Sequence, residues 1–153
     1  MNVTSEPLRE PSKPPKTYRK ELLIRFGDCD PAGIVFYPRY LEMFNELVED
    51  WCRDELSFSF PDVITRRGWG LPTVRLEVDF LAPSSFGDVL KATLVLRNVG
   101  RTSITIEIVF LVPDGPVRVR GKVVLVLIDR TTRRPIALPY ELRLRLASFG
   151  IAG

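Results

Sequence analysis

The residues best suited to chemistry lie in one short segment, residues 28–40, which reads DCDPAGIVFYPRY. It holds two carboxylates, Asp28 and Asp30, beside the turn-forming residues Pro31 and Gly33. A carboxylate in such a loop can act as a nucleophile or as a general base. The same two acids also suit a purely structural role, because aspartate forms turns and caps in many strand-to-helix loops.

This segment runs into a long amphipathic helix. Pro38 stands where proline favours a helix start, and apolar residues then recur at spacings of three and four over residues 38–55. The first amides of a helix have no partner within it, and the helix dipole places positive charge at that end. The backbone around Tyr37 is therefore a candidate site for a developing oxyanion, and with a carboxylate nearby it could cleave an ester-like carbonyl.

The chain contains no histidine. This excludes Ser-His-Asp hydrolases, Cys-His nucleophile pairs and histidine-ligated metals. Its two cysteines, Cys29 and Cys52, form neither a disulfide framework nor the paired spacing of a zinc site. We therefore expect a reducing compartment and a cytoplasmic protein.

Alternating apolar residues predict five strands, one before the helix and four after it, at residues 20–26, 74–80, 90–96, 104–110 and 119–127. Turn sequences around Gly100 and Gly115 predict that the last three strands form an antiparallel meander. A short helix is expected between Pro61 and Gly68, and residues 139–147 fit a helix better than a strand. The pattern indicates an α+β fold in which a five-stranded antiparallel sheet packs against one long helix.

A length of 153 residues fits one domain. Residues 1–17 hold four prolines and few apolar residues, so we expect a flexible N-terminal tail followed by a domain at residues 18–153. There is no signal-peptide order, and no apolar run approaches the ~18 residues of a membrane-spanning helix.

The net charge of +3 comes from residues 1–20, which carry five basic and two acidic side chains. The remaining residues carry 17 of each, and this neutral body argues against nucleic-acid binding. Within it, residues 97–153 hold ten basic and four acidic side chains. Several strands also carry apolar residues on the face away from the helix, which predicts at least a dimer; these are Val89, Val95, Val109 and Val126.

The segment DCDPAGIVFYPRY resembles the signature of the 4-hydroxybenzoyl-CoA thioesterase family of hotdog-fold enzymes, and the similarity extends over roughly residues 19–147. The resemblance implies a curved antiparallel sheet wrapped around the long helix. It also implies homodimers, often homotetramers, whose interfaces build the active sites. The implied reaction is hydrolysis of an acyl-CoA, with an aromatic acyl group such as hydroxybenzoyl or a short one, to a carboxylic acid and CoA. CoA is then part of the substrate, and no metal or further cofactor is expected.

Three residues take roles from this resemblance. Asp30 matches the family's catalytic carboxylate, and the amide of Tyr37 matches the group that polarises the thioester carbonyl. Gly33 would let the loop turn tightly. Whether Asp30 attacks the thioester carbon or activates a water stays open. Pro38 follows Tyr37 as in the bacterial hydroxybenzoyl-CoA branch, whereas many relatives carry histidine there.

The phosphates of CoA need cationic or polar partners. Two groups correspond to positions where the resembled enzymes hold these phosphates at the surface of an adjoining subunit; they are Arg101-Thr102-Ser103 and Arg133-Arg134. Solvated loop arginines are the alternative. Similarly, the aromatic residues that follow the helix could line an acyl pocket or simply pack the loop; they are Phe58, Phe60 and Trp69.

For the chain as a whole, the alternative to a hydrolase is a non-catalytic hotdog protein that binds acyl-CoA. The presence of Asp30 favours the enzyme. The expected partners are the acyl-CoA substrate and further copies of the chain, without nucleic acid or membrane.

Overall fold

The computed structural model describes residues 14–153. Its elements along the chain are β1 (Tyr18–Leu23), the 3-10 turn η1 (Phe26–Asp28), α1 (Tyr37–Leu56), the π-helical turn η2 (Asp62–Arg66), β2 (Trp69–Gly70), β3 (Thr73–Phe80), β4 (Val89–Val99), β5 (Ser103–Leu111), β6 (Val117–Val126), β7 (Ile128–Asp129) and α2 (Tyr140–Phe149). The first 13 residues of the predicted tail lie outside the described part. Of the rest, Lys16 donates its backbone N–H to the Phe149 carbonyl at 2.9 Å.

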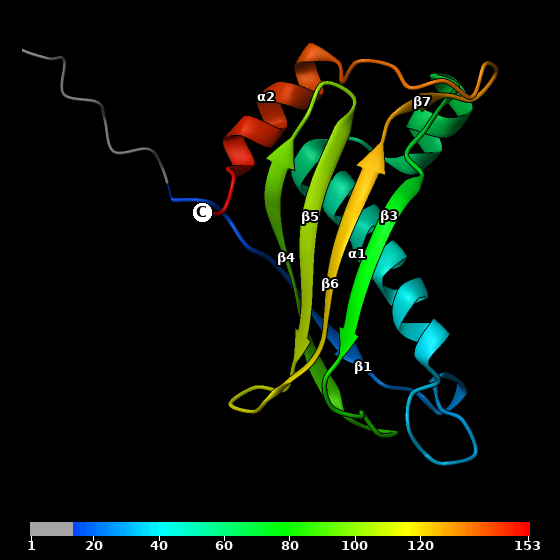
Figure 1. The fold of residues 1–153 in the computed structure, drawn as a ribbon, viewed down its shortest axis with the longest axis vertical. Coiled ribbons are helices and arrows are strands. Elements are labelled where there is room, and N and C mark those ends of the chain that lie inside the picture. Colours follow the sequence, from blue (N-terminus) through cyan, green and yellow to red (C-terminus); the bar gives the residue numbers. More distant parts are fainter. Residues whose placement is uncertain (1–13) are drawn as a thin grey trace, which may run out of the picture.

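The main sheet has five antiparallel strands in the order β1-β4-β5-β6-β3. It curves around α1, and α2 lies beside the upper end of the sheet (Figure 1). The predicted α+β arrangement of a five-stranded antiparallel sheet and one long helix is therefore confirmed, as is the meander of β4, β5 and β6. In the described residues no helix is long and apolar enough to cross a membrane.

The apolar stripe of α1 forms the core against the concave face of the sheet. Its buried side chains follow the predicted spacing, and they include Phe44, Leu47 and Trp51. The Phe44 ring packs directly on the backbone of β6, because a Cβ added at Gly121 would lie 2.3 Å from Phe44 Cε2. Glycine at this position thus lets the helix approach the sheet closely.

Some boundaries differ from the sequence prediction. The first strand begins earlier and ends earlier than residues 20–26, because Tyr18 pairs with Leu94 and the chain enters η1 at Phe26. The pair of two-residue strands β2 and β7 was not predicted, since two residues are too few to show an alternation. The terminal helix is confirmed as α2.

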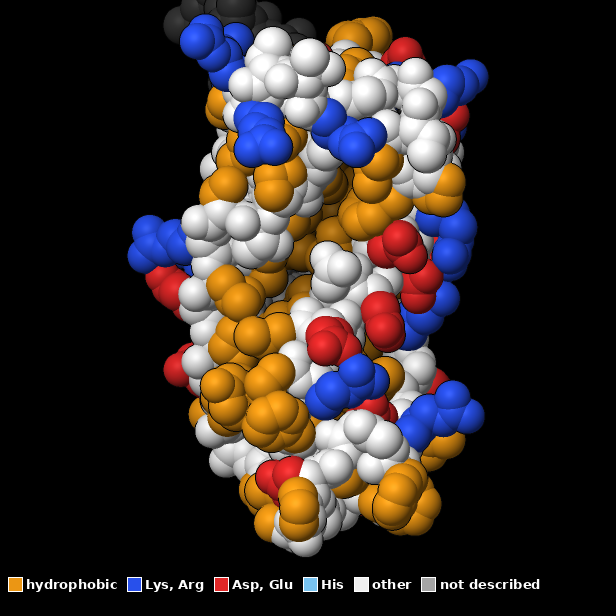
Figure 2. Space-filling view, turned by 90° about the vertical axis from the view of Figure 1, so that its right-hand side faces the viewer, with side chains coloured by type: hydrophobic (Ala, Val, Ile, Leu, Met, Phe, Trp, Pro, Cys, Tyr) orange, Lys and Arg blue, Asp and Glu red, His pale blue; other side chains and the backbone are white. Residues whose placement is uncertain are grey.

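The outer face of the sheet is mixed in character. Val89 is exposed, whereas Val95, Val109 and Val126 are half-buried. The edge strand β3 is more open, because seven of its eight residues are exposed. On the side of α1 and β3 the surface is hollowed and apolar, with acidic side chains gathered along one rim (Figure 2).

Candidate active site

The loop between η1 and α1, which contains Asp30, lies below the start of α1 (Figure 1). The turn closes where the Gly33 N–H donates to the Asp30 carbonyl and the Asp30 N–H donates to the Ile34 carbonyl, both at 2.9 Å. Gly33 has φ +80°, in the left-handed region that glycine adopts without steric cost. Asp30 Oδ1 accepts the Ala32 N–H at 2.9 Å, while Oδ2 has no hydrogen-bond partner among residues 14–153. One carboxylate oxygen is therefore anchored and the other is free.

The first residue of α1 presents a free amide. Tyr37 follows the N-cap residue Phe36, whose own N–H donates to the Asp28 carbonyl at 2.9 Å. Pro38 has no N–H, and the Arg39 N–H donates to the Phe36 carbonyl at 2.9 Å. Within the described residues the Tyr37 N–H has no acceptor. It is thus the one first-turn donor left available at the positive end of the helix dipole.

Asp28, the other acid of the segment, is fully engaged. It is buried, and its carboxylate accepts the Arg25 N–H and one Arg39 N–H, both at 2.8 Å. The hydrogen bond to Asp28 raises the pKa of Arg39, which therefore stays cationic. Asp28 ties the loop to the first turn of α1 and has no free oxygen for a reaction.

Aromatic side chains surround the start of α1. A hollow of about 260 Å³ lies there, lined by Ile34, Val35, Tyr37, Tyr40 and residues 80–83. The Phe80 ring centroid lies 6.0 Å from that of Tyr37 and 5.9 Å from that of Tyr40. The Tyr40 hydroxyl is buried and has no partner in the described chain. This hollow can receive a flat apolar group beside Tyr37, and Asp30 is not among its lining residues.

The predicted phosphate-binding residues lie at the other end of the molecule. Arg101 and Thr102 form the β4–β5 turn, whose carbonyls accept the N–H groups of Leu138 and Leu127 at 2.9 Å, and Ser103 opens β5. Arg133 and Arg134 are exposed in the turn after β7.

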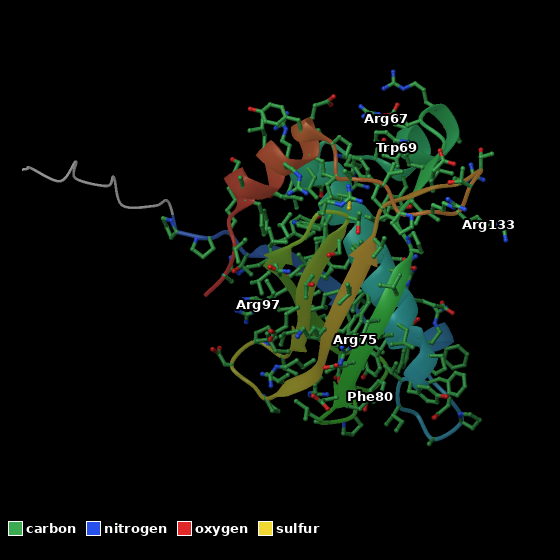
Figure 3. All side chains as sticks on the ribbon, turned by 45° about the horizontal axis from the view of Figure 1, so that its top comes forward. Arg67, Trp69, Arg75, Phe80, Arg97 and Arg133 are labelled. Atoms are coloured by element: carbon green, nitrogen blue, oxygen red, sulfur yellow. The ribbon has the colours of Figure 1, made fainter. Side chains whose placement is uncertain are left out.

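Figure 3 shows Arg133 near Arg67 and Trp69 at this upper end, with Phe80 at the lower end. The 20 residues of α1 span about 30 Å, so the structure does not bring these arginines to Asp30 of the same chain.

The aromatic residues after α1 also belong to the upper end. Phe58 is buried and stacks on Trp69 at 6.4 Å, and the Arg67 guanidinium lies 5.2 Å from the Trp69 ring centroid. Within one chain, loop packing therefore accounts for these residues.

The sequence did not reveal the connection between β3 and β4 as part of the site. The Val35 N–H donates to the Ser84 carbonyl at 2.9 Å, and Ile34 forms a bridge with Ser85. These contacts join segments about 50 residues apart, and no local pattern reports such pairings. The continuation of apolar residues from Phe80 into Leu81 was the only signal.

Comparison with known proteins identifies the family. Residues 24–146, which include the Asp30 turn and all of α1, match the family described as the thioesterase-like superfamily. The chain belongs to this superfamily.

Among thioesterase relatives, the 1,4-dihydroxy-2-naphthoyl-CoA hydrolase of Nostoc punctiforme is 31% identical over 120 residues, 78% of this chain and 79% of its own. The long-chain acyl-CoA thioesterase FadM of Escherichia coli is 28% identical over 127 residues, 82% of this chain and 94% of its own. A Staphylococcus aureus protein solved in complex with CoA has a TM-score of 0.83 at 17% identity, covering 92% of this chain and 88% of that one. The predicted hotdog fold and thioesterase family are confirmed.

Proposed function

We propose that this thioesterase hydrolyses the CoA thioester of a hydroxylated aromatic acid, with Asp30 as the catalytic carboxylate and the Tyr37 N–H as the oxyanion donor. The observation that carries the proposal is the pairing of two unused groups in one loop-to-helix segment. Asp30 keeps a free oxygen, and Tyr37 keeps the free amide of the first turn. A carboxylate and a fixed donor are the two groups that acyl transfer requires.

Two routes use these groups. In the first, an Asp30 oxygen bonds to the thioester carbon, the C–S bond breaks to release the CoA thiolate, and water then hydrolyses the mixed anhydride. In the second, Asp30 takes a proton from a water that attacks the same carbon, and the C–S bond breaks as the carbonyl reforms. In both routes negative charge grows on the carbonyl oxygen, where the Tyr37 N–H stabilises it. Neither route uses a cofactor beyond the CoA of the substrate.

The lining of the hollow supports an aromatic acyl group. Tyr37 and Phe80 are 60% and 50% exposed, so their rings are open to stack with a substrate ring. The Tyr40 ring also lines the hollow, and its buried hydroxyl has no partner in the described chain. The two relatives act on different acyl groups, an aromatic one and a long-chain one by their names. A hollow of about 260 Å³ fits the aromatic group better than a long chain.

The CoA end of the substrate requires a second copy of the chain. Because Arg101, Arg133 and Arg134 lie far from Asp30 in one chain, they can serve its site only from a partner. The exposed edge strand β3 supports such a pairing, since an unpaired edge with apolar side chains is a template for another strand. Val74 and Leu76 are 59% and 40% exposed. Antiparallel pairing of two β3 strands places the upper end of one copy beside the lower end of the other.

One register of this pairing is self-complementary. If Leu76 faces Leu76 of the partner subunit, then Arg75 faces Glu77 of the partner subunit on both sides of the two-fold axis. If the two-fold axis lies one residue away, at residue 75 or 77, like charges face each other. Arg75 then faces Arg75 of the partner subunit, or Glu77 faces Glu77 of the partner subunit. We infer a homodimer in this register, and a homotetramer would be built from it. A particle of 17.4 kDa in light scattering at micromolar concentration would contradict the dimer.

The test of the catalytic assignment is thiol release from a panel of acyl-CoAs by Asp30→Asn. Asparagine keeps the shape of the side chain and its acceptor for Ala32, but it loses the nucleophilic charge. We expect kcat for the best substrate to fall by at least about 100-fold, or ~2.7 kcal/mol of barrier. Asp114→Asn is the matched control, because Asp114 is exposed in the β5–β6 turn at φ +58°, which asparagine tolerates. It should keep the parent rate.

The same panel separates the hydrolase from an acyl-CoA-binding protein. A rate for Asp30→Asn within about tenfold of the parent would remove Asp30 as the principal catalyst. Tight binding of an aromatic CoA ester without thiol release by the parent would instead support the binding protein.

A further inference from the structure

Arg118, at the start of β6, holds the segment that connects β3 to β4. Its carbonyl accepts the N–H groups of Leu81 and Ala82 at 2.9 and 3.2 Å. Its Nη1 donates to the Pro83 carbonyl, and it lies 3.3 Å from both Ser84 Oγ and Asp88 Oδ2. One residue of the sheet therefore fixes residues 81–88 through both its backbone and its side chain.

The 81–88 segment in turn holds the Asp30 loop. Ser84 has no exposed surface, and its carbonyl accepts the Val35 N–H at 2.9 Å. Ser85 forms the bridge with Ile34, whose carbonyl accepts the Asp30 N–H. Val35 is two residues before Tyr37, so the same contacts set the direction of the Tyr37 N–H. A displacement of Ser84 would move both reacting groups of the site.

The Arg118 guanidinium is largely removed from solvent. Its side chain is 18% exposed, and its Nε is buried without a partner in the described residues. A mostly buried cation is stable only when carboxylates and carbonyls surround it. Asp88 supplies the charge, and Asp88 is itself fixed because its Oδ2 accepts the Ser85 N–H at 2.9 Å. One hydrogen-bonded unit thus joins the Arg118 guanidinium, Asp88 and residues 83–85. This unit contacts the Asp30 loop through Ser84 and Ser85.

We propose that Arg118 is a positioning residue for thioester hydrolysis, which places Asp30 and the Tyr37 amide by holding Ser84 against Val35. This inference rests on the proposed function of Asp30 and Tyr37. Arg118 does not touch the substrate in this scheme. Its loss should therefore lower kcat far more than it changes the Michaelis constant, because it displaces the reacting groups through Ser84, whereas only residues 81–83 of the acyl hollow lie in the segment that it holds.

The test compares Arg118→Ala, Arg118→Lys and Arg120→Ala by steady-state thiol release from an aromatic CoA ester. We expect Arg118→Ala to lower kcat by about 10- to 100-fold with a KM change below about threefold. Lysine keeps the charge beside Asp88, so Arg118→Lys should recover part of kcat. Arg120 is the matched control, because it is an exposed arginine two residues along β6 and should be silent. An equal fall in Arg118→Ala and Arg120→Ala, or an effect confined to KM, would overturn the proposal.

A double variant separates this inference from the assignment of Asp30. If Arg118 acts through Asp30, adding Arg118→Ala to Asp30→Asn should cost at least about threefold less than adding it to the parent. If Arg118→Ala lowers kcat by the same factor in both backgrounds, the positioning role is wrong, even when Asp30→Asn alone has a low kcat. If Asp30→Asn alone keeps a kcat close to that of the parent, the proposed function is wrong. That measurement does not involve an Arg118 variant, so the two failures can be told apart.

If Arg118→Ala does not fold, a variant of Asp88 tests the same proposal. Asp88→Asn keeps the side-chain acceptor for the Ser85 N–H but removes the charge that balances Arg118. We expect a fall in kcat of about three- to tenfold with KM unchanged. If Asp88→Asn folds and keeps the kcat and KM of the parent, the Arg118–Asp88 pair does not position the reacting groups.

Discussion

The two ends of α1 differ in how their functional groups are held. At the lower end Asp30 and Tyr37 are placed by backbone hydrogen bonds and by the buried Asp28–Arg39 pair. At the upper end Arg133 and Arg134 stand exposed on a turn, and no hydrogen bond among the described residues fixes their guanidinium groups. The groups at the lower end are held in fixed positions, whereas the upper end presents its charge on exposed side chains.

This difference fits the two tasks that the proposed function gives to the two ends. Acyl transfer loses rate when a reacting group moves by an ångström, so its groups must be fixed before the substrate arrives. Phosphates are bound through charge and flexible side chains, which tolerate a looser arrangement. Because about 30 Å separates the ends, the proposed function needs two copies of the chain, with the lower end of one facing the upper end of the other.

The largest expected effect comes from removing the Tyr37 N–H. Proline is favoured at the first position of a helix, and Phe36 has φ −68° and ψ 120°, a conformation suited to the residue before proline. Tyr37→Pro should therefore fold while it loses the oxyanion donor. We expect kcat to fall by about 100- to 1,000-fold, as for other oxyanion-hole donors. Steady-state thiol release and circular dichroism on the same sample measure the rate and the fold.

Tyr37→Ala provides the control for that variant. It loses the ring as Tyr37→Pro does but keeps the amide, so its kcat should fall at least about tenfold less than that of Tyr37→Pro. If Tyr37→Pro is folded and as fast as Tyr37→Ala, the helix N-terminus does not stabilise the transition state. The fixed position of the Tyr37 N–H would then have no role in catalysis.

The sequence predicted the local structure of the lower end better than the contacts that this end makes with the rest of the chain. The spacing of Phe44, Leu47 and Trp51 placed α1, and Pro31 with Gly33 marked the turn that holds Asp30. These features are local, so they are visible in a window of a few residues. Ser84 and Arg118 were invisible because their contacts depend on the order of strands in the sheet. The distance between Asp30 and Arg133 depends on the same order, and no residue pattern reports it.

The upper end is tested by Arg101→Ala and Arg134→Ala. If these side chains bind CoA phosphates, each loss should raise KM for CoA esters by about three- to tenfold and leave kcat unchanged. Arg19→Ala, an exposed arginine on β1, is the control and should keep the parent KM. Unchanged KM in both variants would remove the phosphate assignment.

Hybrid dimers test whether the lower end of one chain and the upper end of another form one active site. A chain with Asp30→Asn can be paired with a chain that carries Arg101→Ala and Arg134→Ala. In a shared site one of the two active centres then combines an intact Asp30 with intact arginines from the partner. The hybrid should have the low KM of the unmodified protein and about half its kcat. Neither variant homodimer should combine a low KM with a high kcat. No recovery in a verified heterodimer would mean that each chain binds its own substrate alone.

The smallest effect concerns the turn that carries Arg133 and Arg134. Asp129 Oδ1 accepts the N–H groups of Thr131 and Thr132, both at 2.8 Å. The backbone hydrogen bond from Thr132, with that from Thr131, lowers the pKa of Asp129. A carboxyl whose folded pKa is lowered stabilises the protein above its unfolded pKa of about 3.9, and this contribution is lost as the pH falls through the folded value.

Asp129→Ala should therefore lower the Tm by about 1–3 °C at pH 6. The difference from the parent should shrink once the pH falls below the unfolded pKa of about 3.9 and close below the lowered folded pKa, because the parent then loses the same charge. KM for CoA esters should rise about twofold at pH 7, since a looser turn presents Arg134 less well. Calorimetry over this pH range measures the stability of the turn. In the same variant kcat, which the proposed function assigns to the Asp30 end, should not change. A Tm difference that persists unchanged to pH 3 would show that the charge of Asp129 does not hold the turn.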